Sequence, residues 1–359
     1  MTETALTVHQ TARPHGFPTP DHFAFVESAM PQPGPGTALV ENLYWSVDPY
    51  HREMMDGDFA LNAPLEGRAI GRVVDSRHPG LREGEIVFHR QGWRTHTVVT
   101  REQARTIPRF DGVPLSAHLS ILGGTGLTAY VALTRIAELR EGQDLFVSAA
   151  AGGVGTATGR LARLMGAGRL TGSTGTAAKA AYLTEHVGYD EVFDYHAGPV
   201  AELLAEAAPD GIDLYMDNVG GEHLEAAISS LRDHGRIVRI GTIAQYNSTG
   251  TPYALRNLPD IVEKSLRMEG FLVRDHQDVQ EELYEFVVPH LQSGRVTLDE
   301  TVVDGFGGIV DGFLGMLRGE NLGKIIVRAA GAAGAAGAAG AAGAAGAAGA
   351  DGAAGADAS

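Results

Sequence analysis

The chain has 359 residues, of which 44% are hydrophobic and 20% charged, a composition typical of folded globular proteins and a length sufficient for two domains. Its net charge of −16 disfavours nucleic acid and anionic membrane surfaces as partners, and the absence of cysteine excludes disulfides, thiolate catalysis and cysteine-ligated zinc. With no signal-peptide pattern and no apolar run long enough to span a bilayer, we expect a cytoplasmic protein without a membrane partner.

The first 120 residues predict a β-rich domain. Proline- and glycine-bearing turns separate short strand-like runs at residues 37–44, 69–75, 85–89 and 95–100. A further strand at 324–327, close to the end of the ordinary sequence, is expected to return to this domain.

From about residue 126 onward, apolar strands alternate with amphipathic helices. The expected strands are 144–149, 169–174, 191–195, 212–218, 236–241 and 268–273, and the expected helices include 179–186, 200–208, 222–232 and 279–291. This alternation predicts an α/β fold with a doubly wound parallel sheet of the Rossmann type. The expected units are therefore 1–122 with 300–328, 123–299, and a low-complexity tail at 329–359.

The tail consists mainly of Ala-Ala-Gly repeats. It lacks the proline that pre-organises a collagen triple helix, and glycine at every third position costs a helix about 1 kcal/mol each. We therefore expect a disordered segment without chemistry, whose removal leaves activity unchanged.

A glycine-rich turn, AAAGGVG at 149–155, lies between an expected strand and an expected helix. Gly152, Gly153 and Gly155, with Val154 among them, would let the backbone approach a pyrophosphate at the N-terminus of the helix. Ala150 stands where the full dinucleotide motif has its first glycine, so the motif alone is weak. The alternative is a helix that merely begins with glycines.

The next strand favours NADP over NAD. It ends without the acidic residue that would hold the ribose 2′-hydroxyl of NAD. Ser173 and Lys179 instead offer a hydroxyl and a cation for a 2′-phosphate. The alternative for Lys179 is an ordinary solvated helix lysine.

Several motifs together resemble the zinc-free branch of the medium-chain dehydrogenase/reductase superfamily, which holds the leukotriene B4 dehydrogenase/prostaglandin reductase-like and curcumin reductase-like proteins. They occur in the order of that family and cover nearly all of the chain before the tail. They are Ser46-Val47-Asp48-Pro49-Tyr50, Gly92-Trp93-Arg94-Thr95-His96, Leu122-Gly123 with Gly126-Leu127-Thr128-Ala129-Tyr130, AAAGGVG, GSTGTAAK at 172–179, Asp217-Asn218-Val219-Gly220-Gly221, Gly235-Arg236-Ile237-Val238 with Tyr246-Asn247, Phe271-Leu272-Val273, and Gly319-Glu320-Asn321-Leu322-Gly323-Lys324.

The resemblance implies a GroES-like β domain, a Rossmann domain, an active site in the cleft between them, and a homodimer. It implies that Tyr195 lies near the adenosine half of NADP. The residues that it assigns to the nicotinamide half are Asn218, Ile240, Gly241, Thr242, Ile243, Tyr246, Phe271, Leu272, Val273 and Asn321.

The zinc ligands of the related alcohol dehydrogenases are missing, since Glu66-Gly67-Arg68-Ala69 stands where those enzymes have Gly-His-Glu. A histidine-only metal site at His89 and His96 is the alternative, weighed against ordinary hydrogen-bonded histidines. The family usually has methionine where this chain has His51. That histidine would be either an additional proton donor in the cleft or a surface residue.

Without a Lewis acid, an activated C=C bond is the easier hydride acceptor than an isolated carbonyl. The enolate oxygen that develops needs a hydrogen-bond donor, and the α-carbon then needs a proton. Tyr246 is the first candidate and Tyr50 the second. Either tyrosine could be a packing residue, and the ribose of the cofactor could be the donor instead.

We therefore expect NADPH-dependent reduction of the C=C bond of α,β-unsaturated ketones or aldehydes. An NADPH quinone reductase and a non-catalytic NADP-binding protein are the alternatives.

Overall fold

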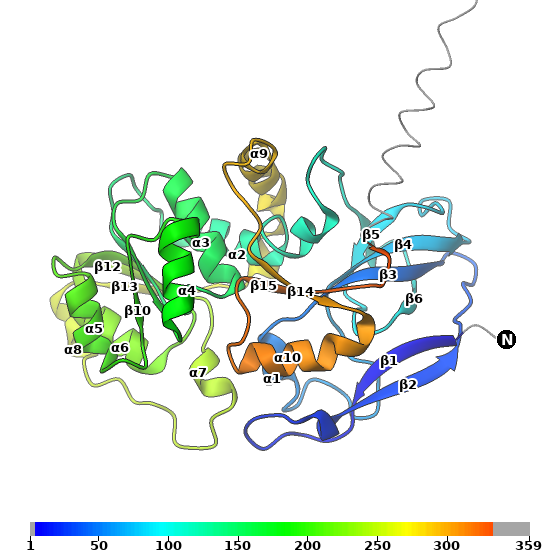
Figure 1. The fold of residues 1–359 in the computed structure, drawn as a ribbon, viewed down its shortest axis with the longest axis horizontal. Helices are drawn as coiled ribbons and strands as arrows, with labels where there is room; N and C mark the ends of the chain where they lie inside the picture. The colour runs from blue at the N-terminus through cyan, green and yellow to red at the C-terminus, as the bar shows by residue number, and fades with distance from the viewer. Residues whose placement is uncertain (1–3, 333–359) are drawn as a thin grey trace, which may run out of the picture.

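The computed structural model describes residues 4–332 (Figure 1). The chain forms a mixed sheet on one side of the molecule and a parallel sheet on the other. All but the first four residues of the expected tail lie outside the described residues. The predicted domain boundaries near residues 122 and 300 stay a prediction.

The mixed sheet has the strand order β14-β15-β3-β4-β5-β7, and β6 pairs with β3. Its central strand, β3, is almost entirely buried because both neighbouring strands and the helices beneath cover it. A separate hairpin of β1 and β2 lies beside this sheet. The strands are β1 (Thr4–Gln10), β2 (Phe23–Ala29), β3 (Ala38–Ser46), β4 (Ala69–Ser76), β5 (Ile86–His89), β6 (His96–Val99), β7 (Ala104–Thr106), β14 (Glu300–Asp304) and β15 (Lys324–Arg328).

The second sheet has the order β10-β9-β8-β11-β12-β13, and all of its neighbouring strands are parallel. This is the doubly wound order predicted from the sequence. The central strand β8 consists of three fully buried apolar residues, as expected where helices cover both faces of a sheet. The strands are β8 (Leu145–Val147), β9 (Leu170–Thr174), β10 (Glu191–Asp194), β11 (Ile212–Asp217), β12 (Leu231–Arg239) and β13 (Arg267–Gly270).

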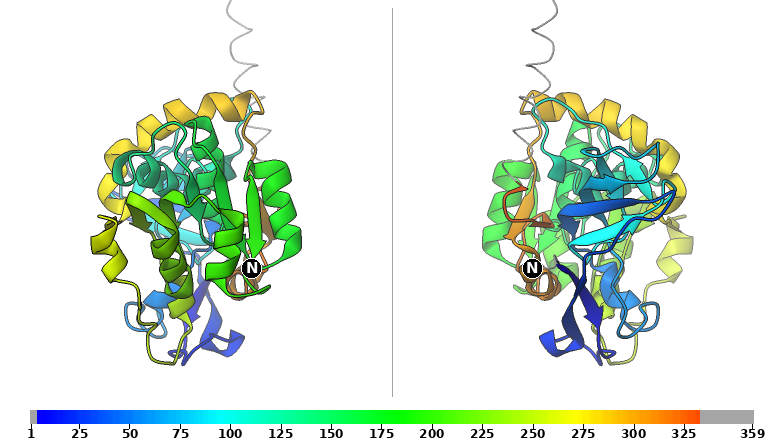
Figure 2. Two further views of the ribbon diagram at one scale, coloured as in Figure 1. Left: turned by 90° about the vertical axis from the view of Figure 1, so that its left-hand side faces the viewer. Right: turned by 90° about the vertical axis from the view of Figure 1, so that its right-hand side faces the viewer.

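Helices cover the two faces of the parallel sheet and bury two separate hydrophobic clusters (Figure 2). Helices α2 (Gly124–Val131), α3 (Gly153–Leu164) and α9 (Gln280–Gln292) pack on one face, and α5 (Val200–Ala207), α6 (Gly221–Ser230) and α8 (Pro259–Glu263) pack on the other. The remaining helices are α1 (Tyr50–Met54), α4 (Ala177–Tyr182), α7 (Ile243–Tyr246) and α10 (Ile309–Leu317).

The last strand, β15, joins the two halves of the molecule. It pairs antiparallel with β3 and parallel with β14, which confirms the predicted return to the first domain. Just before it, Gly323 forms a β-bridge with Gly152 of the glycine-rich turn. The start of β15 is thereby fixed to the turn that leads from β8 into α3.

Some predicted boundaries were wrong. The helix expected at 222–232 ends at Ser230, because β12 already begins at Leu231. The strand expected at 268–273 ends at Gly270, and a 3-10 turn begins at Val273. The hairpin of β1 and β2 and the strand β14 were not predicted. Within residues 4–332, no helix has both the length and the apolar character needed to cross a membrane.

Candidate functional site

The glycine-rich turn leads directly from β8 into α3. Ala149 adopts a left-handed conformation (φ +50°), so the tight bend lies one residue before the position where the full motif has its first glycine. Gly152 is the residue before the first helical residue of α3, and its position provides no side chain to cap the N–H groups at the start of the helix. A Cβ atom on Gly155 would lie 2.5 Å from the Cα atom of Ala150, so only glycine lets α3 pack this closely. The turn therefore fits a pyrophosphate, with the free N–H groups and the positive dipole end of α3 available to it.

The segment 319–324 runs along this turn. The backbone N–H of Gly323 donates to Ala151 O at 2.8 Å, and the side-chain amide of Asn321 donates to Gly323 O at 2.7 Å. Gly323 is in the left-handed region (φ +65°), and a Cβ atom there would lie 2.0 Å from Asp299 O. Asn321, predicted for the nicotinamide half, therefore lies on the segment that contacts the glycine-rich turn.

A Gly323→Ala substitution should consequently disrupt this junction. Asp299 cannot retreat, because Arg160 of α3 holds its carboxylate at 2.6 and 2.8 Å. We expect a loss of about 3 kcal/mol or more in the free energy of unfolding, together with weaker NADPH binding. Gly319→Ala is the matched control, because Gly319 also has positive φ (+70°) but open space around it; it should cost only about 1–2 kcal/mol. Thermal or denaturant unfolding measures both variants, and equal losses would contradict the steric explanation.

Lys179 lies on α4, close to the same junction. Its ammonium group donates to the backbone carbonyl of Gly319, and burial lowers the pKa of the lysine from its ordinary value. The lysine therefore lies at the contact between the two halves of the molecule, half-buried, rather than projecting freely from a helix. This position suits a cation that meets a phosphate beside the glycine-rich turn.

Ser173 and Tyr195, the other residues predicted for the adenosine half of the cofactor, differ in solvent accessibility. Ser173 on β9 is fully buried, and its hydroxyl has no hydrogen-bond partner, so its side chain does not reach the surface where a phosphate would bind. The exposed hydroxyl of this segment belongs to Thr176, which accepts a hydrogen bond from the Lys179 N–H and which the sequence prediction missed. Tyr195, 39% exposed, follows β10 at the same end of the sheet, where its ring is open to an adenosine.

The residues predicted for the nicotinamide half meet at the carboxyl ends of β11 and β12. Asn218 donates its side-chain amide to Ser148 O at 2.8 Å and accepts at its own backbone carbonyl from Ile243 N. A Cβ atom on Gly241 would lie 3.3 Å from Asn218 O and 3.6 Å from the Tyr246 hydroxyl. Ile240, Gly241, Thr242, Ile243 and Tyr246 thus form one wall beside Asn218.

The remaining predicted group, Phe271–Val273, follows the edge strand β13. Phe271 packs partly buried against the main core cluster, whereas the side chain of Leu272 is 53% exposed. Of these two side chains, Phe271 therefore faces the core and Leu272 faces the solvent.

Tyr246 lies where the two halves of the molecule meet, on α7 opposite α1. Thr242 and the negative charge of Glu53 on α1 both influence the pKa of its hydroxyl. Burial, with the negative charge of Glu53, raises the pKa of Tyr246 to about 12, so the phenol stays protonated at neutral pH. The next residue, Asn247, accepts a hydrogen bond from Arg52 Nε at 3.0 Å, which fixes α7 against α1.

Tyr50 begins α1, and its hydroxyl donates to Glu66 at 3.2 Å. The Arg68 guanidinium lies 5.2 Å above its ring, and burial, with the charge of Asp48, raises the pKa of the Tyr50 phenol. Below this group, Lys324 pairs with Asp48 at 3.3 Å. Burial alone would raise the pKa of Asp48, but Lys324 and Arg68 outweigh it and hold that pKa well below its usual range. Tyr50 therefore belongs to a network of paired charged groups, and its hydroxyl already has an acceptor in Glu66.

His51 is buried rather than a surface residue. It is 1% exposed, and its ring packs against those of Tyr50, Trp93 and Phe313. Burial lowers its pKa to about 4, so the imidazole is neutral at neutral pH. The imidazole is therefore not a cationic acid at neutral pH.

The histidines considered for a metal site are used in hydrogen bonds. His89 is buried, with Nε2 2.8 Å from the Asn42 amide oxygen and Nδ1 accepting from Gln91 N. Nδ1 of His96 lies 3.1 Å from the Thr95 hydroxyl. No group of three or more histidine, aspartate or glutamate side chains in residues 4–332 is arranged to hold a metal ion.

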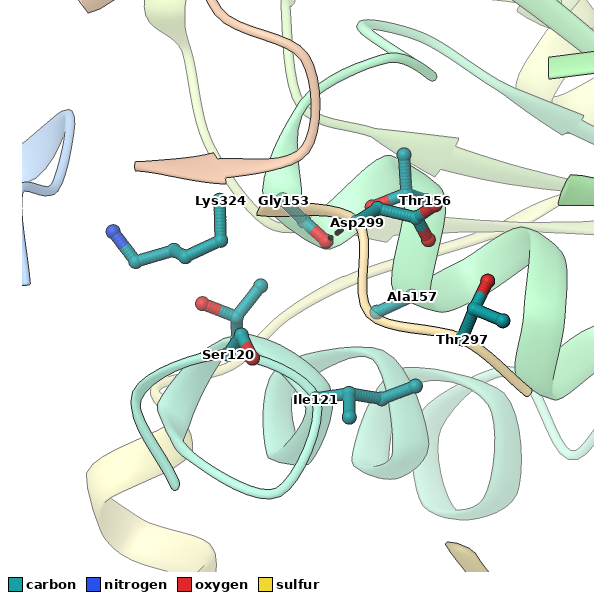
Figure 3. A pocket seen from close by; sticks show the side chains of 9 residues that line it. Ser120, Ile121, Gly153, Thr156, Ala157, Thr297, Asp299 and Lys324 are labelled. Carbon is teal, nitrogen blue, oxygen red and sulfur yellow. Dashed lines mark hydrogen bonds between the residues drawn. The ribbon is translucent and has the colours of Figure 1, made fainter. Parts of the chain in front are cut away.

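A small cavity lies behind the glycine-rich turn (Figure 3). Its volume is about 10 Å³, room for a single water molecule. Lys324 borders it, but its ammonium group points away from Thr156 and Thr297, toward Val47 and Asp48. This cavity is too small for a cofactor or a substrate.

The fold and the site together define a class of protein: a two-domain oxidoreductase that uses a nicotinamide dinucleotide. Comparison with known sequences agrees. Residues 7–107 match the family described as the N-terminal domain of oxidoreductase, and residues 153–288 match the family described as zinc-binding dehydrogenase.

Relatives place the chain more narrowly. It is 38% identical to prostaglandin reductase 1 of Mus musculus over 323 residues, covering 88% of this chain and 96% of the relative. It is 35% identical to an NADP-dependent 2-alkenal reductase of Nicotiana tabacum, covering 82% and 88%. The crystal structure of CurA from Vibrio vulnificus in complex with NADPH matches with a TM-score of 0.85 and 30% identity, covering 90% and 99%. The chain belongs to the zinc-free curcumin reductase/prostaglandin reductase-like branch of the medium-chain dehydrogenase/reductase superfamily.

Proposed function

We propose that this protein is an NADPH-dependent reductase of the C=C bond of α,β-unsaturated ketones and aldehydes. The observation that carries this proposal is the position of the Tyr246 hydroxyl. It lies beside Gly241 and Asn218 at the carboxyl end of the parallel sheet, and its raised pKa keeps it protonated. A neutral phenol at the ligand-binding edge of a Rossmann sheet suits an acceptor that needs a hydrogen bond and later a proton.

When bound, NADPH supplies a hydride, which the β-carbon of the substrate accepts. The chain's own residues provide binding and charge stabilisation. The N-terminus of α3 and Lys179 hold phosphates, and Asn218 with residues 240–243 forms the wall of the nicotinamide half. The Tyr246 hydroxyl donates a hydrogen bond to the enolate oxygen as negative charge develops there.

Tyr50 is the weaker candidate for the proton donor. Its hydroxyl already donates to Glu66, and its ring lies under Arg68. We assign it the role of shaping the wall of the cleft from the first domain.

An absorbance assay tests the proposal. Purified protein with NADPH and a panel of small enones and enals should consume NADPH, and the saturated carbonyl compound should be the product. Turnover of quinones with no turnover of any enone would replace this function with quinone reduction. Tight NADPH binding with no turnover on either panel would favour a non-catalytic NADP-binding protein.

We also propose a cytoplasmic homodimer. In support of a dimer, β13 is an edge strand whose outward side pairs with no strand among residues 4–332. Leu258, Val262 and Leu272, close to it in the sequence, are 51%, 81% and 53% exposed. Light scattering on the purified protein should give twice the chain mass. A Val262→Glu and Leu272→Asp double variant should shift it toward the monomer, and a monomeric parent protein would refute the dimer.

A further inference from the structure

A buried ion pair connects α3 to the residues that precede β14. Arg160 of α3 and Asp299 are 6% and 8% exposed, and the guanidinium donates to both carboxylate oxygens, at 2.6 and 2.8 Å. The same guanidinium donates to the Thr297 hydroxyl at 2.8 Å. Because two parallel hydrogen bonds join the charged groups, the pair fixes the orientation of the Asp299 carboxylate relative to α3.

Asp299 also binds α4 and β15. The Tyr182 hydroxyl of α4 donates to Asp299 Oδ1 at 2.6 Å, and the backbone carbonyl of Asp299 accepts from Lys324 N at 2.8 Å. Asp299 lines the small cavity together with Thr156 of α3 and Lys324 of β15 (Figure 3). Burial, with the charge of Asp299, raises the pKa of Tyr182 to about 12, so its hydroxyl remains a donor at neutral pH. One carboxylate therefore joins three elements beside the glycine-rich turn.

Helix α4, which carries Lys179, has little packing of its own near that lysine. Within residues 177–182, which form α4, no side chain is buried, and the next buried side chain along the chain is that of Leu183. Tyr182 follows Lys179 by three residues, so the two are neighbours on the surface of the helix. The hydrogen bond from Tyr182 to Asp299 therefore fixes the part of α4 from which Lys179 extends.

We propose that Tyr182 is a positioning residue for NADPH, whose hydrogen bond to Asp299 holds Lys179 at the 2′-phosphate. A hydrogen bond to a carboxylate is short and directional, so it limits the movement of α4 relative to α3. Since α3 presents its N-terminus to the pyrophosphate, this contact sets the separation between two phosphate-binding groups of one cofactor site. The inference goes beyond the proposed reduction of enones and rests on the role proposed for Lys179.

Tyr182→Phe tests the proposal, because it keeps the packing of the ring and removes only the hydroxyl. We expect the Kd for NADPH to rise about 3- to 10-fold and the Kd for NADH to rise less than about twofold, since NADH has no 2′-phosphate. Calorimetric titration of both cofactors measures the two constants without turnover. Asp299 is unsuitable for substitution, because its loss would leave the Arg160 guanidinium buried without its partner.

The double variant of Tyr182→Phe and Lys179→Ala separates positioning from a general structural effect. If the Tyr182 hydroxyl acts through Lys179, its removal from Lys179→Ala should change the preference for NADPH over NADH less than about twofold. The proposal is overturned if Tyr182→Phe alone leaves this preference at the parent value. It is also overturned if the hydroxyl has the same effect on the preference with and without Lys179.

Tyr284→Phe is the matched control, because Tyr284 of α9 is buried and its hydroxyl accepts from Arg105 of β7 at 3.4 Å rather than donating to Asp299. It should leave the cofactor preference at the parent value, and a change as large as that in Tyr182→Phe would contradict the proposal. A parent protein that binds NADPH but reduces no enone would refute the proposed function, while these titrations would still decide the role of Tyr182.

Discussion

Replacing Lys179 by alanine is expected to weaken NADPH binding about 10- to 100-fold, while NADH binding changes less than about threefold. The expected size follows from losing one charge-assisted contact to the 2′-phosphate, a group that NADH lacks. Titration of both cofactors by fluorescence or calorimetry measures the two losses. The comparison with NADH also corrects for the contact with Gly319 that the substitution removes.

Lys264→Ala is a matched control for that experiment. Lys264 also donates its ammonium group to backbone carbonyls, those of Ile228 and Ser229 at the end of α6, but it lies away from the glycine-rich turn. It should leave the preference between the two cofactors unchanged. Equal losses of NADPH and NADH binding in Lys179→Ala would contradict the role in binding the 2′-phosphate.

The second large effect is expected for Tyr246→Phe, which should lower kcat about 100-fold and leave the KM for NADPH and the melting temperature close to the parent values. The phenylalanine ring preserves packing but removes the donor to the enolate oxygen. Because the pKa of Tyr246 is raised to about 12, the hydroxyl is protonated throughout the neutral range, so kcat of the parent enzyme should show no loss from phenol ionisation between about pH 7 and pH 10.

Tyr253→Phe is the control, since Tyr253 is exposed and its hydroxyl accepts a hydrogen bond from Arg256 at 3.2 Å. Unchanged turnover in Tyr246→Phe would make Tyr246 a packing residue and leave the ribose of the cofactor as the proton donor.

The parallel sheet could be predicted because its signals are local. Each buried strand, such as β8, is a short apolar run followed by an amphipathic helix, and the glycine-rich turn marks where one leads into the other. The hairpin of β1 and β2 could not be found in this way. Most of β2 is exposed and shows no alternation of apolar and polar residues, so only its pairing with β1 reveals it as a strand.

The residues of the candidate site likewise differ in whether a local rule predicts their position. Asn218, Gly241 and Tyr246 follow strand ends, and the rule for carboxyl edges of parallel strands brings them together. The direction of a side chain within a short helix has no such rule. The burial of His51 among aromatic rings could therefore not be predicted from its position after Tyr50.

The burial of Ser173 could not be predicted for a related reason. The hydroxyls at 173, 174 and 176 are equivalent in the sequence, and only the pleat of β9 and the start of α4 decide which of them is exposed. The role of Lys324 was also hidden, because its partner Asp48 lies in the other part of the chain's first domain and no local pattern links the two.

The most direct test of the central claim is to follow the transferred hydride with NADPH that carries deuterium at the nicotinamide C4 position. The product of a simple enone, analysed by NMR, should be the saturated ketone with deuterium on the β-carbon and a solvent proton on the α-carbon. An allylic alcohol with deuterium on the carbonyl carbon would contradict reduction of the C=C bond.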